Sequence, residues 1–109
     1  SLQTEQGGIN EMLKQIGSFR DAWLEEFFRH STPHRTIPPG IHTTLARKLD
    51  IINAASSYRD LRSPPGNRYE ELNGKLQGYS SIRINQQYRL IFQWVDGKAE
   101  DLYLDAHNY

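Results

Sequence analysis

Cysteine is absent from this chain of 109 residues, and the chain also has no net charge and no long apolar run. Without cysteine, a disulfide framework, a thiolate zinc site and a thiol nucleophile are excluded, and the composition suits a reducing compartment. No apolar stretch approaches the roughly 18 residues that a membrane-spanning helix needs, and no signal peptide is recognisable. We therefore expect a cytoplasmic protein that has no membrane partner.

The charge totals do not indicate a basic nucleic-acid-binding protein. Lysine and arginine number 13, as do aspartate and glutamate, so any basic surface must be local. One local excess exists, because residues 59–89 hold six basic and three acidic side chains. Hydrophobic residues make up 37%, and two Trp, six Tyr and four Phe supply much of a core.

The length fits one domain. Residues 1–11 are polar and contain two adjacent glycines, so we expect a flexible leader or cloning remnant before a single domain at residues 12–109. Residues 12–19 are weakly strand-like, and Ser18 is a candidate cap for the helix that follows. Apolar residues at helical spacing predict helices at 20–30 and 41–56, with a proline-rich loop between them.

From residue 68 onward the apolar period changes to two, which is typical of strands. We predict strands at residues 68–72, 79–84, 88–95 and 99–105, separated by the turn residues Asn and Gly. The order of strand, two helices and an antiparallel meander indicates an α+β fold. Two N-terminal helices should cover one face of a small, mainly antiparallel sheet.

The alternation of side chains constrains how these strands pair. A three-residue loop at 85–87 places Arg83 directly opposite Arg89, and a three-residue loop at 96–98 places Asp105 opposite Arg89. The open face would then gather these three residues, and His107 and Tyr109 share their parity. Two opposed arginines favour a bound anion such as phosphate, although two solvated arginines explain the pattern as well.

A metal site is not expected. His30, His34 and His42 are the nearest to a ligand set, but Pro33 and the proline loop break the helical spacing that such a set needs.

The stretch that carries the two arginines resembles a known family. Residues 78–92 (GYSSIRINQQYRLIF), the aromatic-x-Asp-Gly turn at 94–97 and the Asp-x-His at 105–107 resemble the HigB branch of the RelE-type toxins. Residues 68–74 (RYEELNG) are similar to the preceding strand of that family, and the two-helix start is similar too.

This resemblance implies a ribosome-dependent mRNA endonuclease with the RelE-like fold. Such toxins cut mRNA in the decoding site of the ribosome without a metal or other cofactor, and a HigA-type helix-turn-helix antitoxin neutralises them. Operator DNA would be contacted only through the antitoxin. The alternative is a binding module without catalysis that uses the same face for RNA or protein.

The resemblance also suggests roles for single residues. Arg89 would stabilise the phosphate and the transition state, His107 would transfer a proton, and Asp105 would orient one of these two. The remaining candidates for contact with RNA or phosphate are Arg68, Asn73, Lys75, Arg83 and Tyr109.

Two positions depart from the family pattern. Asn73 stands where a lysine is frequent, and Lys75 would substitute for it from the same strand face or serve only as a turn residue. Ala106 stands where the family has tyrosine, which leaves the identity of the acid and the base open.

Overall fold

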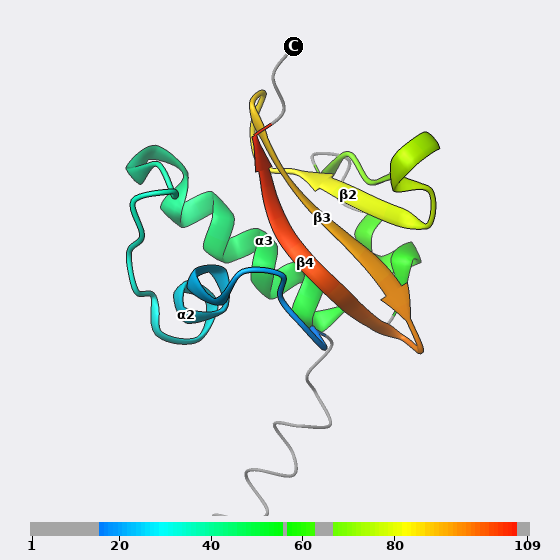
Figure 1. The fold of residues 1–109 in the computed structure, drawn as a ribbon, viewed down its shortest axis with the longest axis horizontal. Coiled ribbons are helices and arrows are strands. Elements are labelled where there is room, and N and C mark those ends of the chain that lie inside the picture. The colour runs from blue at the N-terminus through cyan, green and yellow to red at the C-terminus, as the bar shows by residue number, and fades with distance from the viewer. Residues whose placement is uncertain (1–15, 56, 63–66, 107–109) are drawn as a thin grey trace, which may run out of the picture.

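The computed structural model describes residues 16–55, 57–62 and 67–106, and its elements follow the predicted order. They are the helices α2 (Ala22–His30) and α3 (His42–Ala54), followed by the strands β1 (Glu70–Glu71), β2 (Tyr79–Arg83), β3 (Tyr88–Val95) and β4 (Lys98–Ala106). The strands form one antiparallel sheet in the order β1-β2-β3-β4. In Figure 1 the sheet stands in front of α3, so one face is covered and the other open. The predicted α+β fold is confirmed.

The core lies between the helices and the covered face of the sheet. Leu24 and Phe27 of α2 point into it, and the helical stripe of α3 meets the alternating apolar side chains of β2, β3 and β4. Each fully buried side chain of this kind contributes about 1.5–3 kcal/mol relative to an exposed one. The residues with no exposed surface in this layer include Leu24, Leu45, Leu49, Ile52, Ile82, Leu90, Phe92, Ala99 and Leu102.

Several expected boundaries are wrong. The first helix begins at Ala22 behind Asp21, and Ser18 does not cap it, because its hydroxyl bonds Glu100 and the backbone of Asp101 instead. The first strand was expected at 68–72 but holds only residues 70 and 71. Arg68 has φ 47°, a left-handed conformation that cannot continue a strand. The expected domain start at residue 12 lies outside the described residues.

The hairpin between β2 and β3 has the predicted register. Ile82 lies opposite Leu90 and Arg83 opposite Arg89. The three-residue loop is closed by the N–H of Ile84, which donates to the carbonyl of Tyr88 at 3.0 Å. The prediction of opposed arginines is therefore confirmed.

The hairpin between β3 and β4 reaches the predicted register by another route. Val95 lies opposite Lys98, so the turn has two residues, Asp96 and Gly97, rather than the three that were expected. Both have positive φ, 53° and 80°, which matches the twist of a tight hairpin. Such a turn alone would put Leu104 opposite Arg89, because it shifts the pairing by one residue.

A β-bulge in β4 corrects this shift. The register changes between Ile91 and Gln93, whose partners are Tyr103 and Glu100, so two residues of β4 oppose Phe92 alone. One of these two is Asp101, with φ 54°. Beyond the bulge Arg89 lies opposite Asp105 as predicted. The expected loop length was wrong and the expected pairing was right, because the bulge adds back the residue that the turn omits.

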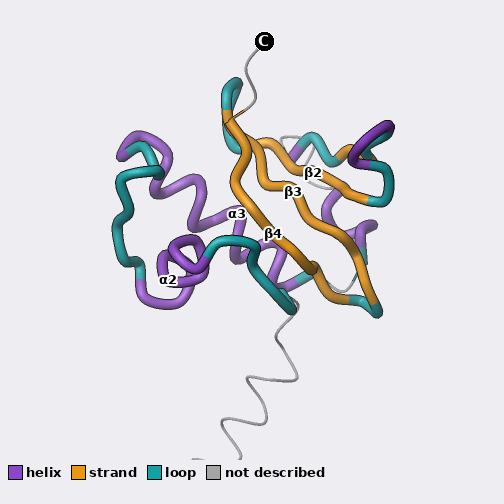
Figure 2. The backbone as a smooth tube through the Cα atoms, in the orientation of Figure 1, coloured by secondary structure: helices purple, strands orange, loops and turns teal. Residues whose placement is uncertain are grey.

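The segment before α2 runs along the outer edge of β4, as the backbone trace in Figure 2 shows. Ile16 and Phe19 form parallel bridges with Ala99 and Leu102. The N–H of Gly17 donates to the carbonyl of Ala99 at 2.7 Å, and the N–H of Arg20 to that of Leu102 at 2.8 Å. The expected strand character of residues 12–19 thus holds for the part from residue 16 onward, and residues 12–15 lie outside the described residues.

Candidate functional site

Two arginines face each other on the open side of the sheet, near the end where β2 turns into β3. Arg83 closes β2 and lies directly opposite Arg89 on β3. Like charges in this arrangement destabilise a sheet by about 0.2–1 kcal/mol. The sequence places them there through the alternation of β2 and β3, because Ile82 and Leu90 must turn inward.

Asp105 on β4 pairs with only one of them. The Nε of Arg89 lies 3.4 Å from its Oδ2, and the two side chains are 21% and 34% exposed. Among the described residues, Arg83 has no ion pair or hydrogen bond to offset its charge. The site therefore keeps an excess positive charge that suits an anion, and the planar forks of arginine match phosphate oxygens.

A shallow hollow, which we call the arginine depression, surrounds the pair. Its volume is about 20 Å³, which is room for a water-sized group. A larger ligand would therefore lie across the hollow rather than inside it. The residues that line it are Arg68, Glu70, Ser81, Arg83, Asn85, Gln86, Gln87, Tyr88 and Arg89.

One wall of the arginine depression is the loop between β2 and β3. The Oδ1 of Asn85 accepts hydrogen bonds from the backbone N–H groups of Gln87 and Tyr88 at 2.8 and 2.7 Å. This Asx-type turn ties the loop to the start of β3. The wall is therefore set by backbone geometry next to Arg89.

The sequence reasoning missed Glu70. It lies opposite Ser81, which shares the open face with Arg83, so its carboxylate belongs to the same hollow as the arginines. The position of Glu70 in β1 places it on the same face of the sheet as Arg83. The irregular connection between β1 and β2 prevents this pairing from being counted along the sequence. That connection contains a turn of 3-10 helix at Gly74–Leu76.

Asn73 and Lys75 fall outside the arginine depression. Lys75 is exposed in that 3-10 turn and not on a strand face, which agrees with the turn residue rather than the strand-face substitute of the two roles that the sequence left open. Asn73 lines a separate groove of about 450 Å³ that includes Trp94. Both precede Tyr79 at the far end of β2 from Arg83, about 13 Å along the strand. His107 and Tyr109 lie outside the described residues.

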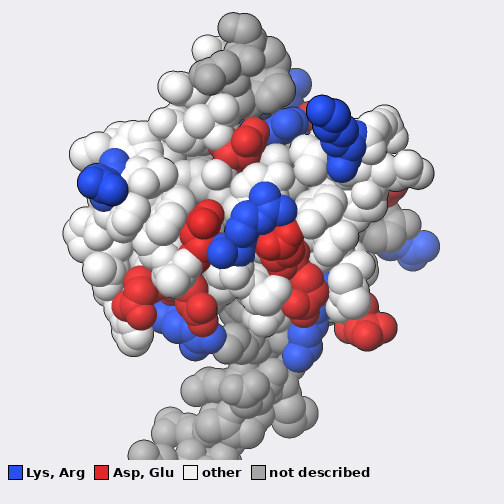
Figure 3. All heavy atoms as spheres, in the orientation of Figure 1, with Lys and Arg blue, Asp and Glu red and all other residues white. Residues whose placement is uncertain are grey.

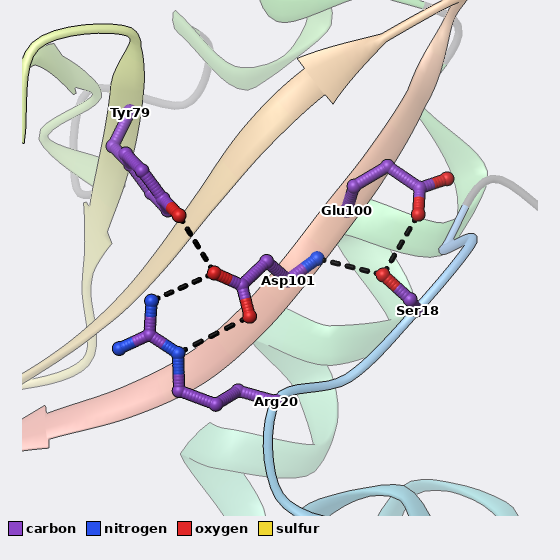
Figure 4. Close-up of polar contacts among 5 residues, drawn as sticks. All are labelled: Ser18, Arg20, Tyr79, Glu100 and Asp101. Atoms are coloured by element: carbon purple, nitrogen blue, oxygen red, sulfur yellow. Dashed lines mark hydrogen bonds and ion pairs between the residues drawn. The ribbon is translucent and has the colours of Figure 1, made fainter.

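A second polar group, which we call the Asp101 cluster, lies further along the open face (Figure 4). Asp101 accepts hydrogen bonds from the Nε and Nη2 of Arg20 at 3.1 and 2.7 Å and from the hydroxyl of Tyr79 at 2.6 Å. The guanidinium of Arg20 also lies 3.7 Å from the ring centre of Tyr103. The cluster ties the segment before α2 to the bulge.

These contacts shift the acidities of the Asp101 cluster. The hydrogen bond from Arg20, and then that from Tyr79, holds the pKa of Asp101 below its usual value. The same bond to Asp101 raises the pKa of Tyr79. Figure 3 shows acidic and basic side chains interspersed over this face, so its positive charge is confined to small sites.

Comparison with known proteins agrees with the fold and the motif. A family model described as the RelE-like toxin of type II toxin–antitoxin system HigB matches residues 17–107. Toxin HigB-1 of Vibrio cholerae is 57% identical over 91 residues, which cover 84% of this chain and 96% of that protein. An uncharacterised protein of Haemophilus influenzae is 45% identical over 91 residues, which cover 84% of this chain and 90% of that protein.

Solved structures share the fold. The YoeB–YefM complex from Staphylococcus aureus contains a chain similar to this one, with a TM-score of 0.52 and 19% identity over 86% of this chain and 98% of that one. The YoeB dimer from the same organism has a TM-score of 0.51 at 18% identity, over 87% of this chain and 99% of that one.

The fold is that of the RelE-like toxins. Within this class the chain belongs to the HigB family, as its motif predicted, and is the toxin of a type II toxin–antitoxin system. RelE-like toxins are endoribonucleases, and a toxin of such a system has an antitoxin partner. Among the described helices none is long and apolar enough to cross a membrane.

Proposed function

We propose that this toxin is a ribosome-dependent mRNA endonuclease that cuts in the decoding site without a metal ion. A HigA-type helix-turn-helix antitoxin neutralises it, and operator DNA is reached only through that antitoxin. One observation carries the proposal: Arg83 and Arg89 lie opposed on an open face, and within the described part of the chain only Arg89 of the two has an ion pair, with Asp105. This leaves positive charge where a scissile phosphate would lie.

The chemistry uses the RNA's own nucleophile. The 2′-oxygen attacks the adjacent phosphorus, its proton leaves to a base, and the bond from phosphorus to the 5′-oxygen breaks to give a cyclic phosphate. Negative charge builds on the non-bridging oxygens in the transition state, where Arg83 and Arg89 stabilise it with charged hydrogen bonds. These guanidinium groups supply the positive charge that a metal ion would otherwise provide.

Two groups would move the protons. Glu70 is the carboxylate that lines the arginine depression, so it is placed to take the proton of the 2′-hydroxyl. His107, one residue beyond the end of β4, would return a proton to the leaving 5′-oxygen. Asp105 orients Arg89 through their ion pair and carries no separate proton-transfer role.

The remaining candidates would contact the RNA beside the scissile bond. Arg68 lines the arginine depression and would bind the neighbouring phosphate. Lys75 and Asn73, at the far end of β2, would meet RNA only at a flanking nucleotide. Tyr109 follows His107 closely and would stack on a base.

The test maps cleavage by primer extension on translating ribosomes. Wild type should cut mRNA at codons in the decoding site, and co-expressed antitoxin of the HigA type should abolish the cuts. Arg89→Ala should lower the cleavage rate by about 10²–10³-fold. Arg47→Ala, an exposed arginine on the opposite, helical side, is the matched control and should cut normally.

Two outcomes would contradict the proposal. Folded wild type that binds ribosomes and makes no cuts would indicate the binding module instead. Cuts that persist in folded Arg89→Ala would move the site away from the arginine depression.

A further inference from the structure

A lysine is buried against the residue that leads into the candidate site. Lys48 of α3 is 6% exposed, and its Nζ donates to the Oδ1 of Asn67 at 2.5 Å. Among the described residues no carboxylate pairs with it. A buried cation with a neutral partner costs free energy that an apolar residue at this helix position would avoid. The presence of a lysine at this position is therefore best explained by the residue that it binds.

What it holds is Asn67. This residue is fully buried, and its Nδ2 donates to the carbonyl of Leu61 at 3.2 Å. One amide thus links α3, the 3-10 turn Tyr58–Arg62 and the chain entering β1. Asn67 directly precedes Arg68, which has the left-handed φ of 47°. A left-handed arginine persists only when the neighbouring chain is fixed.

The strand that follows has little else to fix it. β1 has two residues, which pair with Ser81 and Ser80 of β2. The hydroxyl of Tyr69 adds one hydrogen bond to Ser80 at 2.9 Å. Both Arg68 and Glu70 reach the arginine depression from this short piece of chain. Its position therefore depends on the anchor at its start.

We propose that Lys48 and Asn67 are positioning residues for the active site: their buried hydrogen bond fixes the start of β1 so that Arg68 and Glu70 meet Arg83 and Arg89. The inference rests on the proposed endonuclease function. The hydrogen bond between Lys48 and Asn67 lies beneath the edge of the sheet. It touches neither the substrate nor the reacting atoms, but it affects the cleavage rate through the residues that it positions. A displacement of about 1 Å at such a site lowers turnover by up to about 100-fold.

The test is a double-mutant cycle on steady-state cleavage of ribosome-bound mRNA. Lys48→Met should lower kcat by about 10–100-fold and leave KM within about threefold, because Arg83 and Arg89 still bind phosphate. Combined with Glu70→Gln, it should slow the reaction by clearly less than the product of the two single losses, because both variants act on the Glu70 carboxylate. Asn67→Asp keeps an oxygen for Lys48 but loses the donor to the Leu61 carbonyl, so it should lower kcat by less than Lys48→Met does.

A control separates positioning from stability. Ile52→Val truncates a fully buried side chain on the same helix and should leave kcat unchanged when assayed below its unfolding temperature. Additive losses in the double-mutant cycle, or a normal kcat in folded Lys48→Met, would overturn the proposal.

Hydrogen exchange gives a readout that needs no cleavage. Lys48→Met should speed exchange at the amides of residues 68–71 at least tenfold and leave those of β3 protected. If Lys48→Met fails to fold, Asn67→Ser, which replaces the amide by a shorter hydroxyl side chain, supplies the same measurement. Unchanged amide exchange at residues 68–71 would refute the proposal that Lys48 and Asn67 fix the start of β1, whether or not wild type cuts RNA. The positioning role and the endonuclease function are therefore tested independently.

Discussion

Replacing Asp101 should reverse the usual order of alanine and glycine in a strand. Inside a regular strand, glycine is less stable than alanine by about 0.5–1 kcal/mol. Asp101 instead occupies the bulge with φ 54°, where a Cβ costs about 1–2 kcal/mol and glycine costs nothing. Asp101→Gly should therefore be the more stable variant, by about 1 kcal/mol.

Both variants lose the contacts of the Asp101 cluster. The ion pair with Arg20 is 43% and 34% exposed, so it is worth about 0.5–1 kcal/mol. The hydrogen bond from Tyr79 adds about 1 kcal/mol. We expect Asp101→Ala to lower the free energy of unfolding by about 1.5–2 kcal/mol and Asp101→Gly, which also relieves the strain of the Cβ, by about 0.5–1 kcal/mol.

Urea denaturation of the two variants and wild type measures this directly. In thermal unfolding, each kcal/mol corresponds to about 4–8 °C for a domain near this size. Arg29→Ala, which breaks an exposed pair with Glu25 on α2, is the control and should cost less than about 0.5 kcal/mol. If Asp101→Ala equals or exceeds Asp101→Gly in stability, the reasoning about the bulge is wrong.

Four further predictions concern stability. Because the pKa of Asp101 is lowered, its contribution is present above its ordinary value of 3.8 and lost as pH falls through the lower folded value; Asp101→Asn should therefore flatten the acid limb of a stability–pH curve. Burial lowers the pKa of Lys48, so wild type should gain stability relative to Lys48→Met as pH rises toward 10.5, and equal slopes would refute this. Gly97→Ala should cost about 1–2 kcal/mol in urea denaturation, because φ there is 80°. Trp94→Phe should cost less than the usual 3 kcal/mol or so of an aromatic truncation, because it removes a buried indole N–H without a partner among the described residues; a larger loss in calorimetry would contradict this.

The open face could be predicted because side-chain parity is a strong constraint. Ile82 and Leu90 must both face the core, and with the three-residue loop this fixes Arg83 opposite Arg89. The turn before β4 was harder, because two arrangements satisfy the same parity. A three-residue loop without a bulge and a two-residue turn with one both place Asp105 opposite Arg89.

The roles of Glu70 and Lys48 could not be predicted, because they depend on contacts between segments that no repeating sequence pattern connects. Glu70 reaches the arginine depression through a pairing that follows an irregular connection, so its register cannot be counted from the turn. Lys48 stands beside Leu49 on α3 and, from charge alone, would be assigned to the solvent face. Its burial depends on Asn67, 19 residues away, which no helical or strand pattern links to it.

The parallel bridges between the segment before α2 and β4 have a consequence for biosynthesis. Ser18 and Arg20 bond to residues more than 80 positions later in the chain, so they find these partners only after the last strand is made. The same strand supplies Asp105 and pairs the outer side of β3. A translation product that stops before β4 therefore lacks both the ion pair of the site and the edge strand that the segment before α2 binds. The segment before α2 and Arg89 therefore gain their partners in the same step, when β4 is made.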